Sequence, residues 1–185
     1  MKRWQGTGSD GPPRLSQTGR LRVPEYTRPA TWEDVKQLAR YFEEAGVEYA
    51  LIGGYALAAH GLARFTEDVD VLVNPAPANS QRWIVALSRL PDGAAQELAP
   101  NHDVFAAQQR YAIRINDEIT VDVLPSAGGH SWDELMGHIV EVEIDDVRVR
   151  VLDLPGLLKT KEVPRPKDQA DADAIRRAIE LLQGK

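Results

Sequence analysis

The sequence predicts an α+β fold: a mixed β-sheet with helices mainly on one face and further helices towards the C-terminus. Two observations support this prediction. In the first half, apolar stretches with helical spacing alternate with short runs typical of buried strands, in the order α-β-α-β-α. In the second half, two pairs of alternating apolar segments each surround a short polar turn, which is typical of β-hairpins. Helices would pack against such a sheet to bury its apolar face.

The first predicted helix begins at Thr31, whose hydroxyl can cap a first turn that carries Glu33 and Asp34. Apolar residues three and four positions apart follow, until Gly46 ends the helix. The elements expected next are a strand over 49–52, a helix over 56–60, a strand over 68–73 and a helix over 80–90.

The second half contains the two predicted hairpins. One joins strands 111–115 and 119–124 around Asn116-Asp117, and the other joins strands 140–144 and 147–152 around Asp145-Asp146. Two helices are expected after them, over 154–162 and 169–182, because Pro164 and Pro166 interrupt the helical pattern between them.

A chain of 185 residues is expected to form one domain, here over 29–185. Residues 1–28 are rich in Gly, Pro, Ser, Thr and Arg and lack hydrophobic periodicity, so a flexible tail is predicted for them. The formal net charge of −6 argues against broad nucleic-acid binding. The absence of cysteine excludes disulfides and thiolate metal sites. No apolar run approaches the ~20 residues of a membrane helix, and no secretory signal is seen, so a cytoplasmic protein without membrane contact is expected.

A double glycine, Gly53-Gly54, follows the first predicted strand and precedes a helix. Glycine at such a turn allows the backbone to approach a phosphate closely, and a helix N-terminus favours negative charge. The alternative is that the glycines only permit a tight turn.

Three carboxylates fall within predicted strands. Asp68 and Asp70 are two residues apart and therefore point to the same face of their strand. Asp122 lies in the alternating segment 119–124, and the three converge if the two strands are neighbours. Carboxylates clustered in this way are costly without a cation and suit Mg²⁺. The alternative for Asp68 and Asp70 alone is a solvated polar face.

These motifs together resemble the nucleotidyltransferase superfamily of the DNA polymerase β type. The resemblance is strongest to the toxin nucleotidyltransferases of type IV toxin–antitoxin systems, the AbiEii-like group, and it covers roughly residues 35–182. Its two supporting strings are Gly53-Gly54-x-Ala56 … Gly61-x-x-Arg64-x-Thr66-x-Asp68-Val69-Asp70 and Lys161 … Arg165-Pro166-Lys167-Asp168-x-x-Asp171. It implies the nucleotidyltransferase fold.

The resemblance also implies a role for each matching residue. Asp68 and Asp70 would hold metal ions, and Asp122 would be a third ligand or the base for the acceptor hydroxyl. The other residues implied in nucleotide binding are Gly53, Gly54, Arg64, Thr66, Lys161 and Asp168. Many members have serine where this chain has Gly54, so backbone N–H groups alone would hold the phosphate here.

The implied activity is Mg²⁺-dependent transfer of a nucleoside monophosphate from a nucleoside triphosphate to a hydroxyl, with Mn²⁺ as a substitute cation. The acceptor stays open between transfer RNA, a protein and a small molecule, and a cognate antitoxin is an implied partner. The alternative is a catalytically silent nucleotide- or partner-binding module of the same fold.

Several of these residues also have purely structural interpretations. Arg64 can pair with Asp68 or Asp70, Lys161 can be a solvated side chain, and Asp168 can cap the last helix. The four histidines lack the spacing of metal ligands. The carboxylates of Glu141, Glu143 and Asp145 are expected on the solvated face of an edge hairpin.

Overall fold

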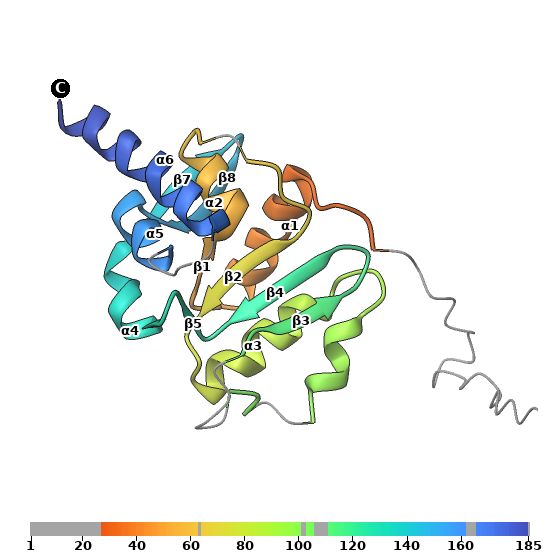
Figure 1. The fold of residues 1–185 in the computed structure, drawn as a ribbon. Coiled ribbons are helices and arrows are strands. Elements are labelled where there is room, and N and C mark those ends of the chain that lie inside the picture. The colour runs from red at the N-terminus through yellow and green to blue at the C-terminus, as the bar shows by residue number, and fades with distance from the viewer. Residues whose placement is uncertain (1–26, 63, 101–102, 106–110, 162–165, 185) are drawn as a thin grey trace, which may run out of the picture.

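The structure is a computed structural model that describes residues 27–62, 64–100, 103–105, 111–161 and 166–184. Its centre is a six-stranded sheet in the order β3-β4-β2-β1-β8-β7 (Figure 1). The strands are β1 (Tyr49–Ile52), β2 (Val69–Val73), β3 (Ile113–Asn116), β4 (Thr120–Leu124), β7 (Ile139–Ile144) and β8 (Val147–Leu152). A separate two-stranded ribbon consists of β5 (Ser126–Ala127) and β6 (His130–Ser131).

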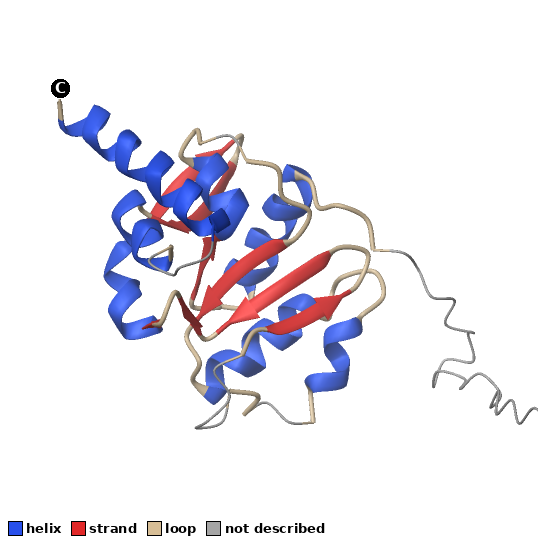
Figure 2. Ribbon diagram, viewed as in Figure 1, coloured by secondary structure: helices blue, strands red, loops and turns tan. Residues whose placement is uncertain are grey.

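Six α-helices and two short 3₁₀ turns, at Ala94–Leu98 and Met136–His138, occur in the described residues. The α-helices are α1 (Trp32–Glu44), α2 (Gly53–Ala59), α3 (Pro77–Leu87), α4 (Trp132–Leu135), α5 (Leu154–Thr160) and α6 (Pro166–Gln183). Figure 2 shows how the helices are placed around the sheet. The predicted mixed α+β architecture is therefore confirmed.

The sheet is mixed in its strand directions. Strands β2 and β4 run parallel, as do β1 and β8, whereas β1 and β2 run antiparallel. Both predicted hairpins are present, as β3–β4 and β7–β8, and each supplies one edge of the sheet. The strand 119–124 lies beside the strand that carries Asp70, which is the condition on which convergence of the three carboxylates depends.

The helices leave part of one sheet face open. Helices α1 and α3 pack together behind the sheet in the view of Figure 1, and α2, α5 and α6 gather over its β1–β8 part. In Figure 1 no helix of the described residues lies in front of β4 and β3 on the face turned to the viewer, whereas α2 also contacts β2. Fully buried apolar side chains of the sheet, such as Val71 and Val123, join those of α1 and α3, such as Phe42 and Trp83, in one core.

Local sequence signals explain several element boundaries. Thr31 caps α1 and forms a capping box with Asp34, as its sequence position predicts. Pro77 starts α3 three residues earlier than the sequence pattern suggests, at a helix position where proline is tolerated. Helix α2 begins directly at Gly53, so no loop separates it from β1.

The predicted tail over 1–28 lies outside the described residues except for its last two. Of these, Arg28 forms a two-pronged ion pair with Asp34, at 2.7 and 2.8 Å, and a second pair with Glu118 at 3.3 Å. Arg28 thereby connects the start of α1 to the β3–β4 turn.

Candidate active site

Two of the predicted carboxylates lie side by side on the open sheet face. Asp70 on β2 is the direct register partner of Asp122 on β4, and Arg114 on β3 is the partner of Asp122 on its other side. Neighbouring strands are about 5 Å apart, and register partners point to the same face. The sheet therefore places two carboxylates and a guanidinium in one row.

Asp68 completes the group of acidic residues, one position before β2 begins. Its side chain is 37% exposed, whereas that of Asp122 is 14% exposed. We call Asp68, Asp70 and Asp122 the carboxylate cluster. Sequence reasoning predicted all three members.

Arg114 binds two members of the carboxylate cluster. Its Nε donates to Asp122 Oδ1 at 2.9 Å and its Nη2 donates to Asp122 Oδ2 at 2.7 Å, which is the two-pronged geometry of strong arginine–carboxylate pairs. The same Nη2 also donates to Asp68 Oδ2 at 3.1 Å. These contacts raise the pKa of the Arg114 guanidinium further above its usual range.

Asp70 lies in the least favourable environment of the three. Burial, together with the negative charges of Asp122 and Asp68, raises the pKa of its carboxyl group from 3.8 to about 6. The positive charges of Lys161 and Arg64 act in the opposite direction but do not cancel this effect. A perturbed carboxyl group among charged neighbours is a typical property of functional sites.

The two glycines make close packing around Asp70 possible. Gly53 has a φ of +64°, and a Cβ at this position would overlap the Asp70 carboxylate. A Cβ at Gly54 would lie 2.6 Å from Thr66 Cβ. Thr66 in turn donates a hydrogen bond to the backbone oxygen of Asp68 at 3.1 Å. Gly53, Gly54 and Thr66 therefore belong to the immediate surroundings of the carboxylate cluster.

Arg64 and Lys161 are held by carboxylates of the last helix. Arg64 pairs with Asp171 at 2.5 Å, and Lys161 pairs with Asp168 and with Asp171 at 3.1 Å each. All four side chains are at most 18% exposed. We call Arg64, Lys161, Asp168 and Asp171 the α6 ion cluster. The structural pairing expected for Arg64 thus occurs with Asp171 instead of Asp68 or Asp70, and Lys161 is paired, not merely solvated.

A comparison with protein families gives a match for this chain. Residues 37–162 match the family model described as nucleotidyl transferase AbiEii toxin of type IV toxin–antitoxin systems. The match spans more than half of the chain and contains the whole carboxylate cluster and Lys161.

The chain belongs to the AbiEii nucleotidyl transferase family.

One of two similar solved structures supports the same fold, with a TM-score above 0.5. A crystal structure of a Thermotoga maritima protein to which nucleotidyltransferase activity has been ascribed is 12% identical, with a TM-score of 0.53; the match covers 88% of this chain and 98% of that one. An antigenic nucleotidyltransferase-like protein from Paracoccidioides brasiliensis is 16% identical with a TM-score of 0.45, over 83% of this chain and 78% of that one. At such identities these likenesses concern the fold alone. The search of curated proteins gives no match.

Membership of the family raises the question of a metal ion. Among the described residues, no three His, Asp or Glu side chains are arranged so that they could hold one. The donors of the carboxylate cluster nevertheless fit a divalent cation, because they are hard carboxylate oxygens on adjacent strands. A positive group, the Arg114 guanidinium, already bridges two of them as a stand-in cation would.

Sequence reasoning missed Arg114 as a site residue and did not include Asp171 among the site residues. The signal for Arg114 was its position on the predicted strand opposite Asp122, which becomes informative only once the hairpin register is known. The signal for Asp171 was its place in the C-terminal string, three residues after Asp168.

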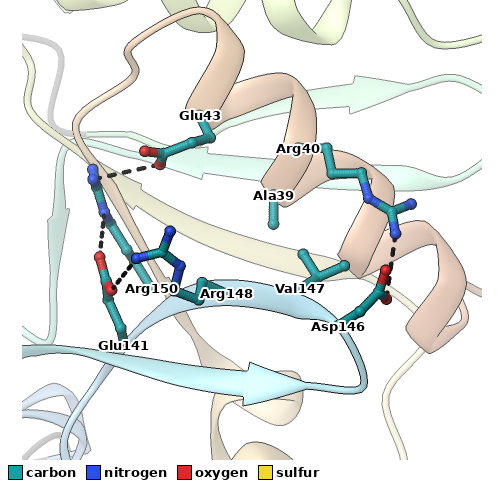
Figure 3. A pocket seen from close by; sticks show the side chains of 8 residues that line it. All are labelled: Ala39, Arg40, Glu43, Glu141, Asp146, Val147, Arg148 and Arg150. Carbon is teal, nitrogen blue, oxygen red and sulfur yellow. Dashed lines mark ion pairs between the residues drawn. The ribbon is translucent and has the colours of Figure 1, made fainter.

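A second group of charged residues lies away from this site. A hollow of about 220 Å³ between α1 and the β7–β8 hairpin is lined by Ala39, Arg40, Glu43, Glu141, Asp146, Val147, Arg148 and Arg150 (Figure 3). We call it the hairpin hollow. Its ion pairs are long, for example 3.4 Å between Arg150 and Glu43 and 3.6 Å between Arg40 and Asp146. Glu141 lines it, as expected for the polar face of an edge hairpin.

None of the helices in the described ranges combines the length and the apolar character needed to cross a membrane.

Proposed function

We propose that this chain transfers a nucleoside monophosphate from a nucleoside triphosphate to a hydroxyl group, with a divalent cation as cofactor. The observation that carries the proposal is the row of Asp70 and Asp122 on adjacent strands, with Asp68 beside it, on the open face of the sheet. The family to which the chain belongs is described as nucleotidyl transferase, which supports the same reaction.

In this reaction, the acceptor oxygen attacks the α-phosphorus of the triphosphate while the bond to the bridging oxygen of the β-phosphate breaks. Pyrophosphate leaves with the electrons of that bond. The acceptor loses its proton, and we assign Asp122 as the base that takes it up, since its side chain faces the same open surface as Asp70.

Mg²⁺, or Mn²⁺ in its place, would be held by Asp68, Asp70 and Asp122 after their side chains turn towards one ion, because their present arrangement does not hold one. When bound, the cation would lower the pKa of the acceptor hydroxyl and neutralise charge on the leaving pyrophosphate. The raised pKa of Asp70 supports this assignment, because a carboxylate that is destabilised by burial and by like charges gains most from a cation.

The remaining residues would position the triphosphate. Gly53 and Gly54 allow Asp70 and Thr66 to pack against the start of α2, and we assign the backbone N–H groups of the two glycines as donors to a phosphate. Lys161 and Arg64 are near enough to Asp70 for their positive charges to lower the pKa of its carboxyl group. We assign them to electrostatic attraction of the phosphates, and Asp168 to orienting Lys161, which it contacts at 3.1 Å.

The family description adds a biological role to the proposal. We propose that the chain acts as the toxin of a type IV toxin–antitoxin pair in the cytoplasm and that a cognate antitoxin opposes it. The acceptor would then be transfer RNA, a protein or a small molecule whose modification stops growth.

The test is incubation of the purified protein with each α-³²P-labelled triphosphate, Mg²⁺ and a cell extract, followed by separation of RNA, protein and small molecules. Label in one fraction, absent with the Asp70→Asn variant, is the expected result and identifies the acceptor class. If no fraction is labelled, while Mg²⁺ and a triphosphate together still raise the melting temperature, the protein is a silent nucleotide-binding module and the proposed transfer is wrong.

A further inference from the structure

The side chain that sequence reasoning missed, Arg114, uses the same oxygens that a cation would need. Its guanidinium engages both carboxylate oxygens of Asp122 and one of Asp68. A divalent cation bound by these two residues would take at least some of those oxygens. Two positive groups that require the same lone pairs compete with each other.

We propose that Arg114 is a built-in counter-ion of the carboxylate cluster, which holds Asp68 and Asp122 before a divalent cation binds and is displaced when one does. This inference rests on the proposed function, because it takes the carboxylate cluster as the site of that cation. It adds that the chain itself contains a group, the Arg114 guanidinium, that competes with the cation for the same carboxylate oxygens.

The location of Arg114 allows such a displacement. Strand β3 is the edge of the sheet, and the Arg114 side chain is 56% exposed although it makes three hydrogen bonds. An exposed arginine on an edge strand can turn into solvent without disturbing the core, since its backbone stays paired with β4.

The electrostatics of the cluster explain why a counter-ion is needed. Without Arg114, three carboxylates would face one another on adjacent strands. Lys161 and Arg64, which also act on Asp70 among the described residues, are already paired with Asp168 and Asp171. Arg114 is therefore the cation that balances Asp68 and Asp122 directly.

Displacement also leaves a free guanidinium beside the place proposed for the triphosphate. A planar guanidinium fork matches phosphate oxygens as well as it matches a carboxylate. Cation loading would therefore release a phosphate-binding group at the open face at the moment when a metal–nucleotide complex arrives.

The chain offers a matched control for an experiment on Arg114. Arg28 also forms a two-pronged pair with one carboxylate, Asp34 at 2.7 and 2.8 Å, and a single contact with another, Glu118 at 3.3 Å. Its side chain is 41% exposed. Arg28→Gln therefore removes a comparable bridge that does not involve the carboxylate cluster.

The experiment measures Mn²⁺ binding to the full chain without nucleotide, by titration calorimetry and by electron paramagnetic resonance. The proteins compared are wild type, Arg114→Gln, Arg114→Lys, Arg28→Gln and Asp70→Asn. We expect Arg114→Gln to bind Mn²⁺ about tenfold more tightly than wild type and Arg114→Lys to lie between them. Arg28→Gln should stay within about twofold of wild type.

Thermal unfolding provides the second readout. With EDTA, both Arg114→Gln and Arg28→Gln should melt below wild type, because each leaves two carboxylates without their partner. Mn²⁺ should raise the melting temperature more for Arg114→Gln than for wild type, whereas Arg28→Gln should respond as wild type does. A purely structural role of Arg114 would lower the melting temperature and leave Mn²⁺ affinity unchanged.

The outcomes separate the two proposals. If wild type binds Mn²⁺, Asp70→Asn abolishes the binding, and Arg114→Gln has unchanged or weaker affinity, the counter-ion role is wrong and the metal site stands. If no variant binds Mn²⁺, or if Asp70→Asn binds as tightly as wild type, the metal site of the proposed function fails and the counter-ion role fails with it.

Discussion

The carboxylate cluster with Arg114 and the hairpin hollow both combine arginine with acidic side chains, but they differ in how the chain brings these together. In the carboxylate cluster, strand register sets Asp70, Asp122 and Arg114 side by side on an open sheet face. In the hairpin hollow of Figure 3, exposed side chains from α1 and the β7–β8 hairpin meet across a groove, with ion pairs of 3.4 to 3.8 Å.

The difference shows which charged clusters deserve a functional interpretation. Each arginine in the hairpin hollow has an acidic partner on a neighbouring element or strand, so its charges are balanced there. In the carboxylate cluster the backbone forces like charges together, and the pKa of Asp70 rises to about 6. A functional site is indicated by a charged group that the fold holds in an energetically unfavourable environment, and not by a high density of charges alone.

The largest expected effect is on catalysis. Asp70→Asn should reduce nucleotidyl transfer by at least about a hundredfold, the scale on which loss of one essential electrostatic group is felt. Glu141→Gln in the hairpin hollow is the matched control and should keep activity within about twofold. Initial rates with saturating Mg²⁺ and labelled triphosphate measure both. Equal losses in the two variants would remove the distinction between the clusters.

The next effect concerns Gly53, and Gly46 is its control because both have a φ of +64°. Gly46→Ala should cost about 1–2 kcal/mol of unfolding free energy from backbone strain alone, since a Cβ there meets no atom within 4 Å. Gly53→Ala adds an overlap with the Asp70 carboxylate and should cost about 3 kcal/mol or more. Urea unfolding measures the two values, and similar losses would show that Asp70 does not restrict this position.

A pH dependence of stability follows from Asp70. Its pKa in the folded state, about 6, exceeds its ordinary value of 3.8, so the folded state binds the proton more readily. The stability gained from this proton is complete below about pH 4 and is lost as the pH rises through about 6. In EDTA, wild type should therefore lose on the order of 2 kcal/mol relative to Asp70→Asn between pH 4 and pH 7. A pH-independent difference between the two proteins would contradict the predicted shift.

The smallest effect is expected in the hairpin hollow. Arg148→Gln removes an ion pair with Glu141 of 3.8 Å from a side chain that is 81% exposed. Exposed pairs contribute little, so the unfolding free energy should change by less than about 0.5 kcal/mol and less still in 0.5 M salt. A loss above about 1 kcal/mol would show that this hollow is more tightly organised than its distances indicate.

Much of the fold could be predicted from local patterns in the sequence. The cap at Thr31, both hairpins and the strand that carries Asp70 depend on short-range signals, and each is present. That Asp70 and Asp122 lie close together was predicted only on the condition that their two strands are neighbours. Whether β4 lies beside β2 is decided by the packing of the whole sheet, which no local pattern of residues 119–124 reveals.

The place of Arg114 in the site could not be predicted, because it depends on the turn that precedes β4. The pairing of Asn116 with Thr120 leaves Asp117, Glu118 and Ile119 in the loop of the hairpin. Asp117 is buried and accepts hydrogen bonds from the backbone N–H groups of Asp92 and Ala94, both distant in sequence. That tertiary contact accompanies the register that places Arg114 opposite Asp122.

The α6 ion cluster has a consequence for the order in which a newly made chain assembles the surroundings of Asp70. Arg64 and its partner Asp171 are separated by 107 positions in the chain. While the ribosome is still making the last helix, Arg64 and Lys161 lack the acidic partners that fix them beside the carboxylate cluster. The surroundings of Asp70 are therefore completed only after α6 has been made and has packed against the rest of the chain.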